Sequence, residues 1–401
     1  MVRLEGKAAV AQGGGPTAVI NQSLAGVVIE ARKYPCITHV YGALHGVRGI
    51  VNEDFLDLSR ATNHNLEMVG LTPSSALGST RDKPDAAYCE RIVDVFQRHD
   101  VRYFFYIGGN DSAETCRIVS TFAEKKGYDL RVIHVPKTID NDIRVTDHTP
   151  GFGSAAKFVV NAFAGLDLDN FAIPGVFVGV VMGRSAGFLT ATAVIARRWP
   201  GDGPHLVYVP EAPFTIDHFL NDVDRVYSQH GRCVAAVCEG VVAEDGVPIL
   251  LKLKEVEERD PFGNLQLSGR STLGDALSDA VKARLKIKRV RCDTFGYLQR
   301  SFLGVTSPVD VSEARNVGET GVLFAVHSEL NGSVAIRRTG DYSVEYFLTP
   351  LETVAGDTKP LPREFLKGNN DIDDSFKNYA RPLMGPMPQV DRLIAPRVQI
   401  G

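Results

Sequence analysis

Two carboxylates stand two positions apart where an apolar segment of the chain ends. Residues 137–142 read KTIDND and follow the apolar run at 132–135, which predicts a buried strand. Open α/β sheets bind ligands at the carboxyl ends of their strands, so Asp140 is placed to take a proton from a substrate hydroxyl and Asp142 to help hold a divalent cation. Phosphoryl transfer requires both functions. The alternative is structural, because Asp and Asn after a strand also form turns or cap helices.

Two glycine-containing turns follow other predicted strands. Residues 12–16 read QGGGP and run into a predicted helix, where backbone N–H groups can approach an anion. Residues 108–112 read GGNDS and combine two glycines with an amide, a carboxylate and a hydroxyl. Either turn alone has a structural explanation, as a tight turn with an N-cap residue. Because these turns and the KTIDND segment all follow strands of one predicted sheet, we expect the three to share one ligand site.

Composition excludes several classes of protein. The chain has 401 residues, 44% hydrophobic and 23% charged, so two globular domains are expected. A net charge of −4 predicts no nucleic-acid partner and no membrane surface, so an anionic ligand must be held by local basic groups. The six cysteines form no CxxC pair, and neither a signal peptide nor a long apolar span is present. We therefore expect a cytoplasmic enzyme with reduced thiols.

The elements that must position these residues alternate between short apolar and longer amphipathic segments. This pattern predicts an α/β fold of two Rossmann-like three-layer domains with mostly parallel sheets and an active site in the cleft between them. The predicted strands are 8–11, 39–42, 103–107, 131–135, 176–181, 206–209, 234–238, 249–253 and 288–292. The predicted helices are 18–32, 87–99, 112–126, 154–166, 187–197, 216–230, 272–286 and 312–330.

The motifs together resemble those of the phosphofructokinase family, over nearly the whole chain. The matching segments are GGNDS at 108–112, TIDND at 138–142, MGR at 182–184, VCEG at 237–240 and GYLQRS at 296–301. The order and spacing of five motifs distinguish this match from a chance one. The resemblance implies a donor domain at 1–150 plus about 299–357, a sugar-phosphate domain at 151–298, and a C-terminal tail at about 358–401 that packs on the surface.

The resemblance also implies a role for each matching residue. Asp140 would deprotonate O1 of fructose 6-phosphate, with Thr138, Arg184 and Lys137 as the other catalytic residues. Asp111 and Asp142 would bind Mg²⁺. The implied donor-binding residues are Gly14, Gly15, Arg81, Asn110, Asp111, Ser112 and Lys137. The implied sugar-phosphate ligands are Thr138, Asp140, Met182, Gly183, Arg184, Glu239, Arg291, Tyr297 and Arg300.

Two departures from the ATP-using members point to another donor. Those members typically carry glycine at the positions of Asp111 and Lys137. Asp111 adds bulk and negative charge in the path of a nucleotide, whereas Lys137 adds a cation that can grip a small, highly charged donor. The pair resembles the pyrophosphate-dependent branch. The expected reaction is therefore reversible, Mg²⁺-dependent phosphorylation of fructose 6-phosphate by pyrophosphate, giving fructose 1,6-bisphosphate and phosphate in glycolysis or gluconeogenesis.

Other departures and alternatives stay open at this stage. Asn110 stands where the family usually has a metal-contacting aspartate, and Tyr297 where ATP-dependent members often have His. Lys377 and Arg381 in the tail are further candidates for the phosphate clamp, the set of residues, with Arg291 and Arg300, that would bind the 6-phosphate of the sugar. The alternatives are an ATP-dependent 6-phosphofructokinase, a non-catalytic regulatory subunit, and a kinase acting on lipids or dinucleotides. Within the main interpretation the resemblance implies a homodimer or homotetramer with little allosteric control, and sedoheptulose 7-phosphate is a further possible acceptor.

Overall fold

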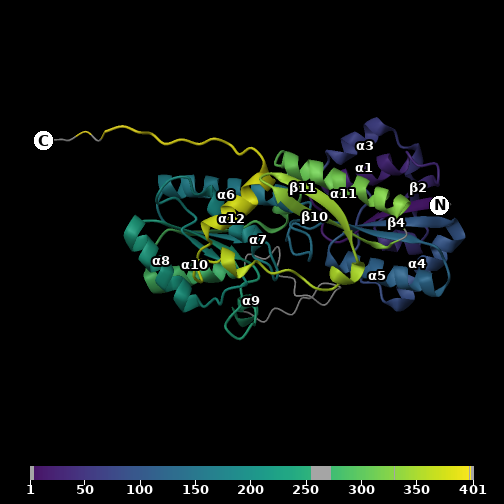
Figure 1. The fold of residues 1–401 in the computed structure, drawn as a ribbon. Coiled ribbons are helices and arrows are strands. Elements are labelled where there is room, and N and C mark those ends of the chain that lie inside the picture. The colour runs from purple at the N-terminus through teal and green to yellow at the C-terminus, as the bar shows by residue number, and fades with distance from the viewer. Residues whose placement is uncertain (1–3, 254–271, 329, 397, 399–401) are drawn as a thin grey trace.

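The computed structural model describes residues 4–253, 272–328, 330–396 and 398, and the described chain contains two sheets flanked by helices (Figure 1). The larger sheet has seven strands in the order β11-β10-β5-β4-β1-β2-β3. Its pairs are parallel except β2 with β3 and β10 with β11. The strands are β1 (Gly6–Gln12), β2 (Ile37–Ala43), β3 (Phe55–Asp57), β4 (Val101–Gly108), β5 (Arg131–Pro136), β10 (Gly332–Gly340) and β11 (Ser343–Thr349).

The smaller sheet has four strands in the order β7-β8-β6-β9, all paired in parallel. They are β6 (Val176–Val181), β7 (Leu206–Tyr208), β8 (Cys233–Cys238) and β9 (Val290–Thr294). The helices are α1 (Ile20–Ala31), α2 (Val47–Val51), α3 (Asn63–Gly70), α4 (Ala86–His99), α5 (Asn110–Lys125), α6 (Phe152–Ala172), α7 (Phe188–Ala191), α8 (Ile216–His230), α9 (Ile249–Leu253), α10 (Thr272–Leu285), α11 (Pro308–His327) and α12 (Asp374–Met384). The predicted α/β fold with mostly parallel sheets is confirmed.

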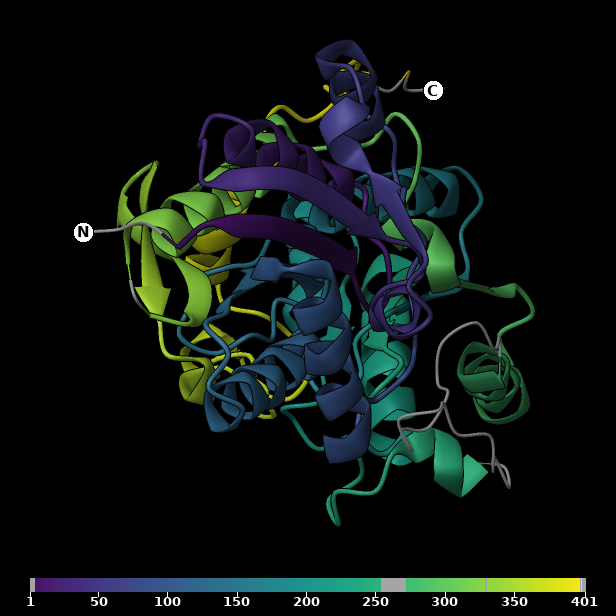
Figure 2. The same ribbon diagram turned by 90° about the vertical axis from the view of Figure 1, so that its right-hand side faces the viewer.

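Alternation along the strands explains why helices cover both faces of each sheet. On β1, Ala8 and Val10 pack in the core under α1 and α11, whereas Ala9 and Ala11 pack on the other face with α2, α4 and α5. Figure 2 shows the strands of this sheet between the two helix layers. The smaller sheet repeats the arrangement, because α6 and α12 cover one face while α8 and α10 cover the other.

One predicted strand is wrong. Residues Ile249–Leu253 form the short helix α9 instead, with Ile249 and Leu250 buried against the smaller sheet. The segment ILLKL is too short to show a readable period, so its sequence alone could not distinguish a strand from a helix. Elements without a sequence prediction are α2, α3, β3, α12 and the β10–β11 hairpin, which joins the larger sheet beside β5.

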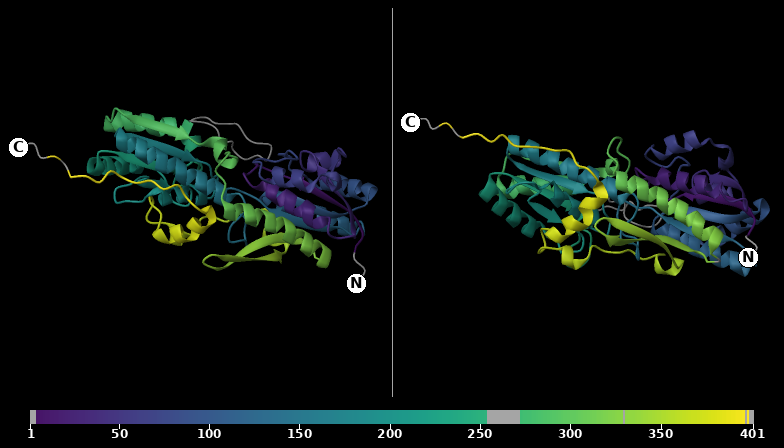
Figure 3. Two further views of the ribbon diagram at one scale, coloured as in Figure 1. Left: turned by 90° about the horizontal axis from the view of Figure 1, so that it is seen from above. Right: turned by 45° about the horizontal axis from the view of Figure 1, so that its top comes forward.

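The C-terminal region contains a helix that takes part in the core. On α12, the side chains of Phe376, Ala380, Leu383 and Met384 are at most 1% exposed and pack in the cluster that contains α6. After Gly385 the chain continues in extended form away from α12 (Figure 3). No described helix is long and apolar enough to cross a membrane. The predicted domain boundaries stay a prediction.

Candidate active site

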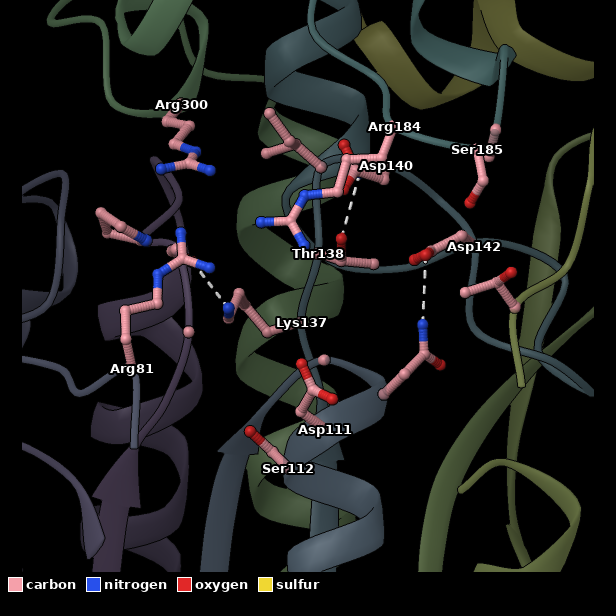
Figure 4. Close-up of a pocket in the computed structure, with 18 of the residues that line it drawn as sticks. Arg81, Asp111, Ser112, Lys137, Thr138, Asp140, Asp142, Arg184, Ser185 and Arg300 are labelled. Carbon is pink, nitrogen blue, oxygen red and sulfur yellow. Dashed lines mark hydrogen bonds between the residues drawn. The ribbon is translucent and has the colours of Figure 1, made fainter. Parts of the chain in front are cut away.

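A cavity of about 610 Å³ opens where strands of both sheets end. Loops that follow β1, β4 and β5 line one side of it, and loops that follow β6 and β8 line the other. Fourteen predicted site residues line it: Gly14, Gly15, Arg81, Asn110, Asp111, Ser112, Lys137, Thr138, Asp140, Asp142, Met182, Arg184, Glu239 and Arg300. Figure 4 shows ten of the lining residues with labels, projecting into one space from separate elements. The carboxyl ends of parallel strands thus meet at one edge, as the sequence predicted.

Three predicted sugar-phosphate ligands do not line this cavity. Gly183 only turns its backbone N–H toward the Glu239 Oε1 atom, at 3.4 Å. Arg291, on β9, is exposed, and its Nη1 atom donates to the neighbouring Val290 carbonyl at 3.0 Å. Tyr297 is 51% exposed and lies under the Arg300 guanidinium, 4.8 Å from its ring centre. Of the predicted phosphate clamp, this cavity therefore contains Arg300 but not Arg291 or Tyr297.

The two carboxylates of the TIDND loop have different surroundings. Asp140 has a buried Oδ1 atom without a hydrogen-bond partner in the described part of the chain. Asp142 accepts a hydrogen bond from Asn110 Nδ2 at 3.1 Å. Burial, and next the charge of Asp140, raise the pKa of Asp142 to about 7, although Lys359 and Arg184 act against this rise. Charging both carboxyls is therefore unfavourable unless a cation approaches them.

The residues at this position fit a divalent cation. Within the described ranges no group of three or more His, Cys, Asp and Glu side chains is placed to hold a metal. However, Asn110 Oδ1 is buried without a partner in the described chain, as is Asp140 Oδ1, and both lie in the lining with Asp142. Such oxygen atoms are the ligands that Mg²⁺ prefers, and the positive charge of a cation would act against the rise in the pKa of Asp142 that burial and Asp140 cause. Asp111, the other predicted metal ligand, lines the same cavity (Figure 4).

Cations gather on the donor side of the cavity. Lys137 is 3% exposed, and its Nζ atom donates to the Gly15 carbonyl at 2.6 Å. Burial, together with the charges of Arg300 and Arg81, lowers the pKa of Lys137 to about 7. A buried ammonium between two guanidinium groups is unfavourable in the free protein, so this arrangement favours an anionic ligand.

Glycines in the QGGGP turn allow the backbone to lie close to the cationic side chains of Lys137 and Arg300. Gly14 has φ +74°, and a Cβ atom there would lie 3.4 Å from Lys137 Nζ. A Cβ atom on Gly15 would lie 2.9 Å from the Arg300 guanidinium carbon. The backbone of the QGGGP turn therefore runs directly against the cationic groups, which explains the glycines independently of any ligand.

The GGNDS segment forms the first turn of α5. Gly109 is the N-cap, and the backbone N–H groups of Ser112 and Ala113 both donate to its carbonyl. A Cβ atom on Gly108 would lie 1.9 Å from Ser112 Oγ, so a glycine is needed where the strand meets the helix. Asp111 is exposed on this first turn and lines the cavity. Its carboxylate therefore occupies space that a larger anionic donor would need. Its negative charge also interacts with the positive potential at the N-terminus of α5, which would otherwise be available to that donor.

The opposite side of the cavity is built by two loops in close contact. Met182 and Arg184 follow β6, and Glu239, 3% exposed, follows β8. A Cβ atom on Gly240 would lie 1.7 Å from the Arg184 carbonyl oxygen, so glycine is required for the loops to approach. This contact fixes the backbone of the arginine that faces the TIDND loop.

Several lining residues had no sequence prediction. They are Pro16, Thr80, Asp82, Lys83, Tyr106, Thr115, Ile139, Ser185, Ala186, Gly356 and Thr358. Lys83 could have been inferred from its nearness to Arg81. The segment at 356–359 gave no local signal, because it reaches the site through a bridge between Ile143 and Thr358 and a hydrogen bond from Lys359 N to the Asp142 carbonyl at 2.6 Å.

The two tail candidates, Lys377 and Arg381, do not reach the cavity. Lys377 pairs with Asp374 at 2.7 Å, Arg381 is exposed, and neither lines the cavity. The residue of this segment that does reach the catalytic loop is Tyr379, whose hydroxyl accepts a hydrogen bond from Asn141 Nδ2 at 2.7 Å.

Comparison with known proteins gives consistent matches. The family model described as phosphofructokinase matches residues 7–324. A protein of Rhodospirillum rubrum named pyrophosphate–fructose 6-phosphate 1-phosphotransferase is 58% identical over 396 residues, which cover 98% of each chain. A protein of the same name from Halomonas elongata is 37% identical over 411 residues, covering 97% of this chain and 96% of the other. The crystal structure of a pyrophosphate-dependent phosphofructokinase from Marinobacter aquaeolei superposes with a TM-score of 0.85 at 32% identity, covering 98% of both chains.

Proposed function

Because the chain belongs to the phosphofructokinase family, we propose that it transfers a phosphoryl group reversibly from pyrophosphate to O1 of fructose 6-phosphate. The products are fructose 1,6-bisphosphate and phosphate. The observation that carries the choice of donor is that Asp111 and the buried Lys137 both line one cavity. The relatives named above act on pyrophosphate by name, which supports the same donor here.

The acceptor chemistry rests on Asp140. Its buried Oδ1 atom has no partner in the described chain and is therefore available to accept the proton from the sugar hydroxyl. The backbone N–H of Asp140 donates to Thr138 Oγ1 at 3.1 Å, which holds the loop turned toward the cavity. Arg184 faces this loop from the opposite side and is placed to meet negative charge on the phosphoryl group during transfer.

The donor chemistry rests on concentrated positive charge. Arg81, Lys137 and Arg300 line one part of the cavity, and the turn at Gly14 and Gly15 brings backbone close to them. Pyrophosphate lacks the adenosine that supplies apolar contacts to ATP, so charge must provide more of its binding free energy. A bound anion would also raise the pKa of Lys137, so binding of the donor and protonation of this lysine support each other.

The cation that fits this site is Mg²⁺. Asp142 and Asn110 are the residues that would hold it, and Asp111 is the further ligand that the family resemblance implies, whereas Asp140 Oδ1 stays available for the proton. When bound, Mg²⁺ neutralises charge on the transferring phosphoryl group. The raised pKa of Asp142 means that the free protein loses Mg²⁺ affinity as pH falls below about 7.

We further propose a cytoplasmic homodimer or homotetramer without strong allosteric control. Glu211 lies where ATP-dependent relatives bind an effector, according to the resemblance. Here its Oε1 atom accepts hydrogen bonds from the backbone N–H groups of Gly187, at 2.9 Å, and Leu361, at 2.7 Å. Two of the chain's own donors therefore engage this carboxylate, which supports weak regulation.

A donor comparison tests the proposal. Purified protein is assayed for fructose 1,6-bisphosphate with fructose 6-phosphate and Mg²⁺, using pyrophosphate in one series and ATP in the other. We expect turnover with pyrophosphate and little with ATP. Turnover with ATP alone would refute the donor and leave the acceptor chemistry standing, and no turnover with either donor would support the non-catalytic subunit instead.

A further inference from the structure

The residue between the two catalytic-loop carboxylates is held by its side chain. Asn141 is fully buried and has φ +59°, a left-handed conformation that residues other than glycine rarely adopt. Its Oδ1 atom accepts a hydrogen bond from Thr149 N at 3.0 Å, and its Nδ2 atom donates to Tyr379 Oη at 2.7 Å. Because Asp140 and Asp142 flank it, the orientation of Asn141 sets the direction in which each carboxylate leaves the backbone.

Tyr379 connects this residue to the far end of the same loop. Its hydroxyl accepts from Asn141 and donates to the Asp147 carbonyl oxygen at 2.9 Å. The Asp147 carbonyl also accepts from Lys359 Nζ at 2.9 Å, and its backbone N–H donates to the Ile336 carbonyl at 2.8 Å. One hydroxyl therefore ties the middle of the loop to a point that is fixed on β10.

The tyrosine is itself held by several elements. Arg338, on β10, donates from Nη1 to the Tyr379 carbonyl at 2.9 Å, and its guanidinium carbon lies 4.9 Å from the ring centre. The ring also lies 5.7 Å from Phe365 and from Phe376, and 6.4 Å from Phe188. These contacts fix the Tyr379 ring on α12 and so restrict the position of its hydroxyl.

We propose that Tyr379 is a positioning residue for phosphoryl transfer, acting through Asn141 on the carboxylates of Asp140 and Asp142. Tyr379 does not line the cavity, so its effect reaches the reaction only through the loop. The C-terminal helix α12 is then part of the catalytic apparatus, although it lies more than 200 residues from the loop along the chain. This inference rests on the proposed function.

Loss of the Tyr379 hydroxyl should disturb the orientation of the Asp140 and Asp142 carboxylates rather than the binding of the substrates. Without the hydroxyl, Asn141 Nδ2 loses its partner, and only the hydrogen bond from Thr149 N to Asn141 Oδ1 continues to hold the side chain, so the loop is less firmly kept in the left-handed conformation. Small displacements of a catalytic group reduce the rate strongly. The cationic residues Arg81, Arg184 and Arg300 lie on other loops, and Lys137, at the start of this loop, is held by its own hydrogen bond to the Gly15 carbonyl. The turnover number should therefore fall while the Michaelis constants stay.

The matched variants are Tyr379→Phe and Tyr346→Phe. Tyr346 is also half-buried, and its hydroxyl accepts a hydrogen bond from Asn316 Nδ2 at 3.1 Å, a partner on α11 and outside the catalytic loop. We expect Tyr379→Phe to lower kcat by about tenfold, with the KM for both substrates within about twofold, because the hydroxyl loses its hydrogen bonds to Asn141 and to the Asp147 carbonyl. Tyr346→Phe should keep kcat. Equal kcat in both variants would overturn the inference.

A double-mutant cycle tests whether the effect passes through Asn141. Asn141→Gly removes the amide and still permits the left-handed conformation. In that background, Tyr379→Phe should change kcat by less than about twofold, because the hydrogen bond is already absent. A tenfold effect that persists would place the influence of Tyr379 elsewhere and overturn the inference.

Hydrogen exchange separates this inference from the proposed function. Backbone amides at 139–147 should exchange faster in Tyr379→Phe than in Tyr346→Phe, whatever reaction the protein catalyses. An inactive wild-type protein with this difference would refute the reaction but keep the tie between helix and loop. Unchanged exchange at 139–147 would overturn the tie even in an active enzyme.

Discussion

The donor assignment makes a quantitative prediction about Lys137. Replacing it by Met keeps an unbranched side chain of similar length in a position that is 3% exposed, and removes the ammonium. Hydrogen bonds to a charged group contribute about 1.5–3 kcal/mol, so kcat/KM for pyrophosphate should fall about 10- to 100-fold at pH 6. At that pH the lysine is about 90% protonated, given its pKa of about 7.

The difference in kcat/KM for pyrophosphate between wild type and Lys137→Met should become smaller as pH rises. Two units above a pKa of about 7, only about 1% of the free enzyme carries the protonated lysine, and its advantage in binding the anion falls accordingly. At pH 9 we therefore expect kcat/KM for Lys137→Met to lie within about threefold of wild type. Ionisation of pyrophosphate itself, and of Asp142, affects both proteins and cancels in the ratio.

The assay is the ratio of kcat/KM for pyrophosphate, wild type over variant, between pH 6 and pH 9 at saturating fructose 6-phosphate and Mg²⁺. A ratio that does not change with pH would refute the argument, as would a ratio near one at pH 6. Unfolding measurements provide the control. The folded pKa of Lys137 lies below its ordinary value of 10.5, so the unfolded chain binds more protons between about pH 7 and 10.5 and wild-type stability rises with pH there. Lys137→Met should lose this rise and should not be less stable at pH 7.

Further substitutions test other parts of the site. Asp140→Asn should lower kcat about a thousandfold in both directions without changing the unfolding temperature, because only the proton acceptor is lost; a modest loss in steady-state assays would exclude it as the base. Asp111→Gly should raise the use of ATP relative to pyrophosphate by about tenfold, since it removes bulk and like charge, and an unchanged ratio in the donor assay would contradict the steric argument. Gly240→Ala, whose Cβ would lie 1.7 Å from the Arg184 carbonyl, should cost about 1–3 kcal/mol in denaturant unfolding, whereas Gly165→Ala in α6, with no atom within 4 Å, should be neutral or stabilising.

Local sequence was sufficient for the strand ends and for the loops that follow them. The short, mostly apolar segments at β1, β4 and β5 are properties of adjacent residues, and their nearly continuous burial is typical of strands in a parallel sheet covered on both faces. Glycines and carboxylates after those strands then had to meet at one edge, because parallel strands end on the same side of a sheet. Lys137, Asp140, Asp142 and Asp111 were found in this way, and all four line the cavity.

Helix α9 and the β10–β11 hairpin could not be predicted from the local sequence. The five residues Ile249–Leu253, four of them apolar, are compatible with a strand and with a helix, and packing against the smaller sheet favours the helix. β10 pairs with β5 across about two hundred residues of sequence, so no neighbouring residue reports that pairing.

The sequence by itself determined which residues could perform phosphoryl transfer, and the tertiary structure decided which of them share a cavity and what holds them. Arg291 and Tyr297 are sugar-phosphate ligands according to the family resemblance, yet neither lines the cavity that contains Arg300. Tyr379 belongs to no motif, yet it holds Asn141 between the two carboxylates. The physical reason is that side-chain type and spacing are local properties, whereas a hydrogen bond between residues more than two hundred positions apart exists only after the core around α6 and α12 has packed.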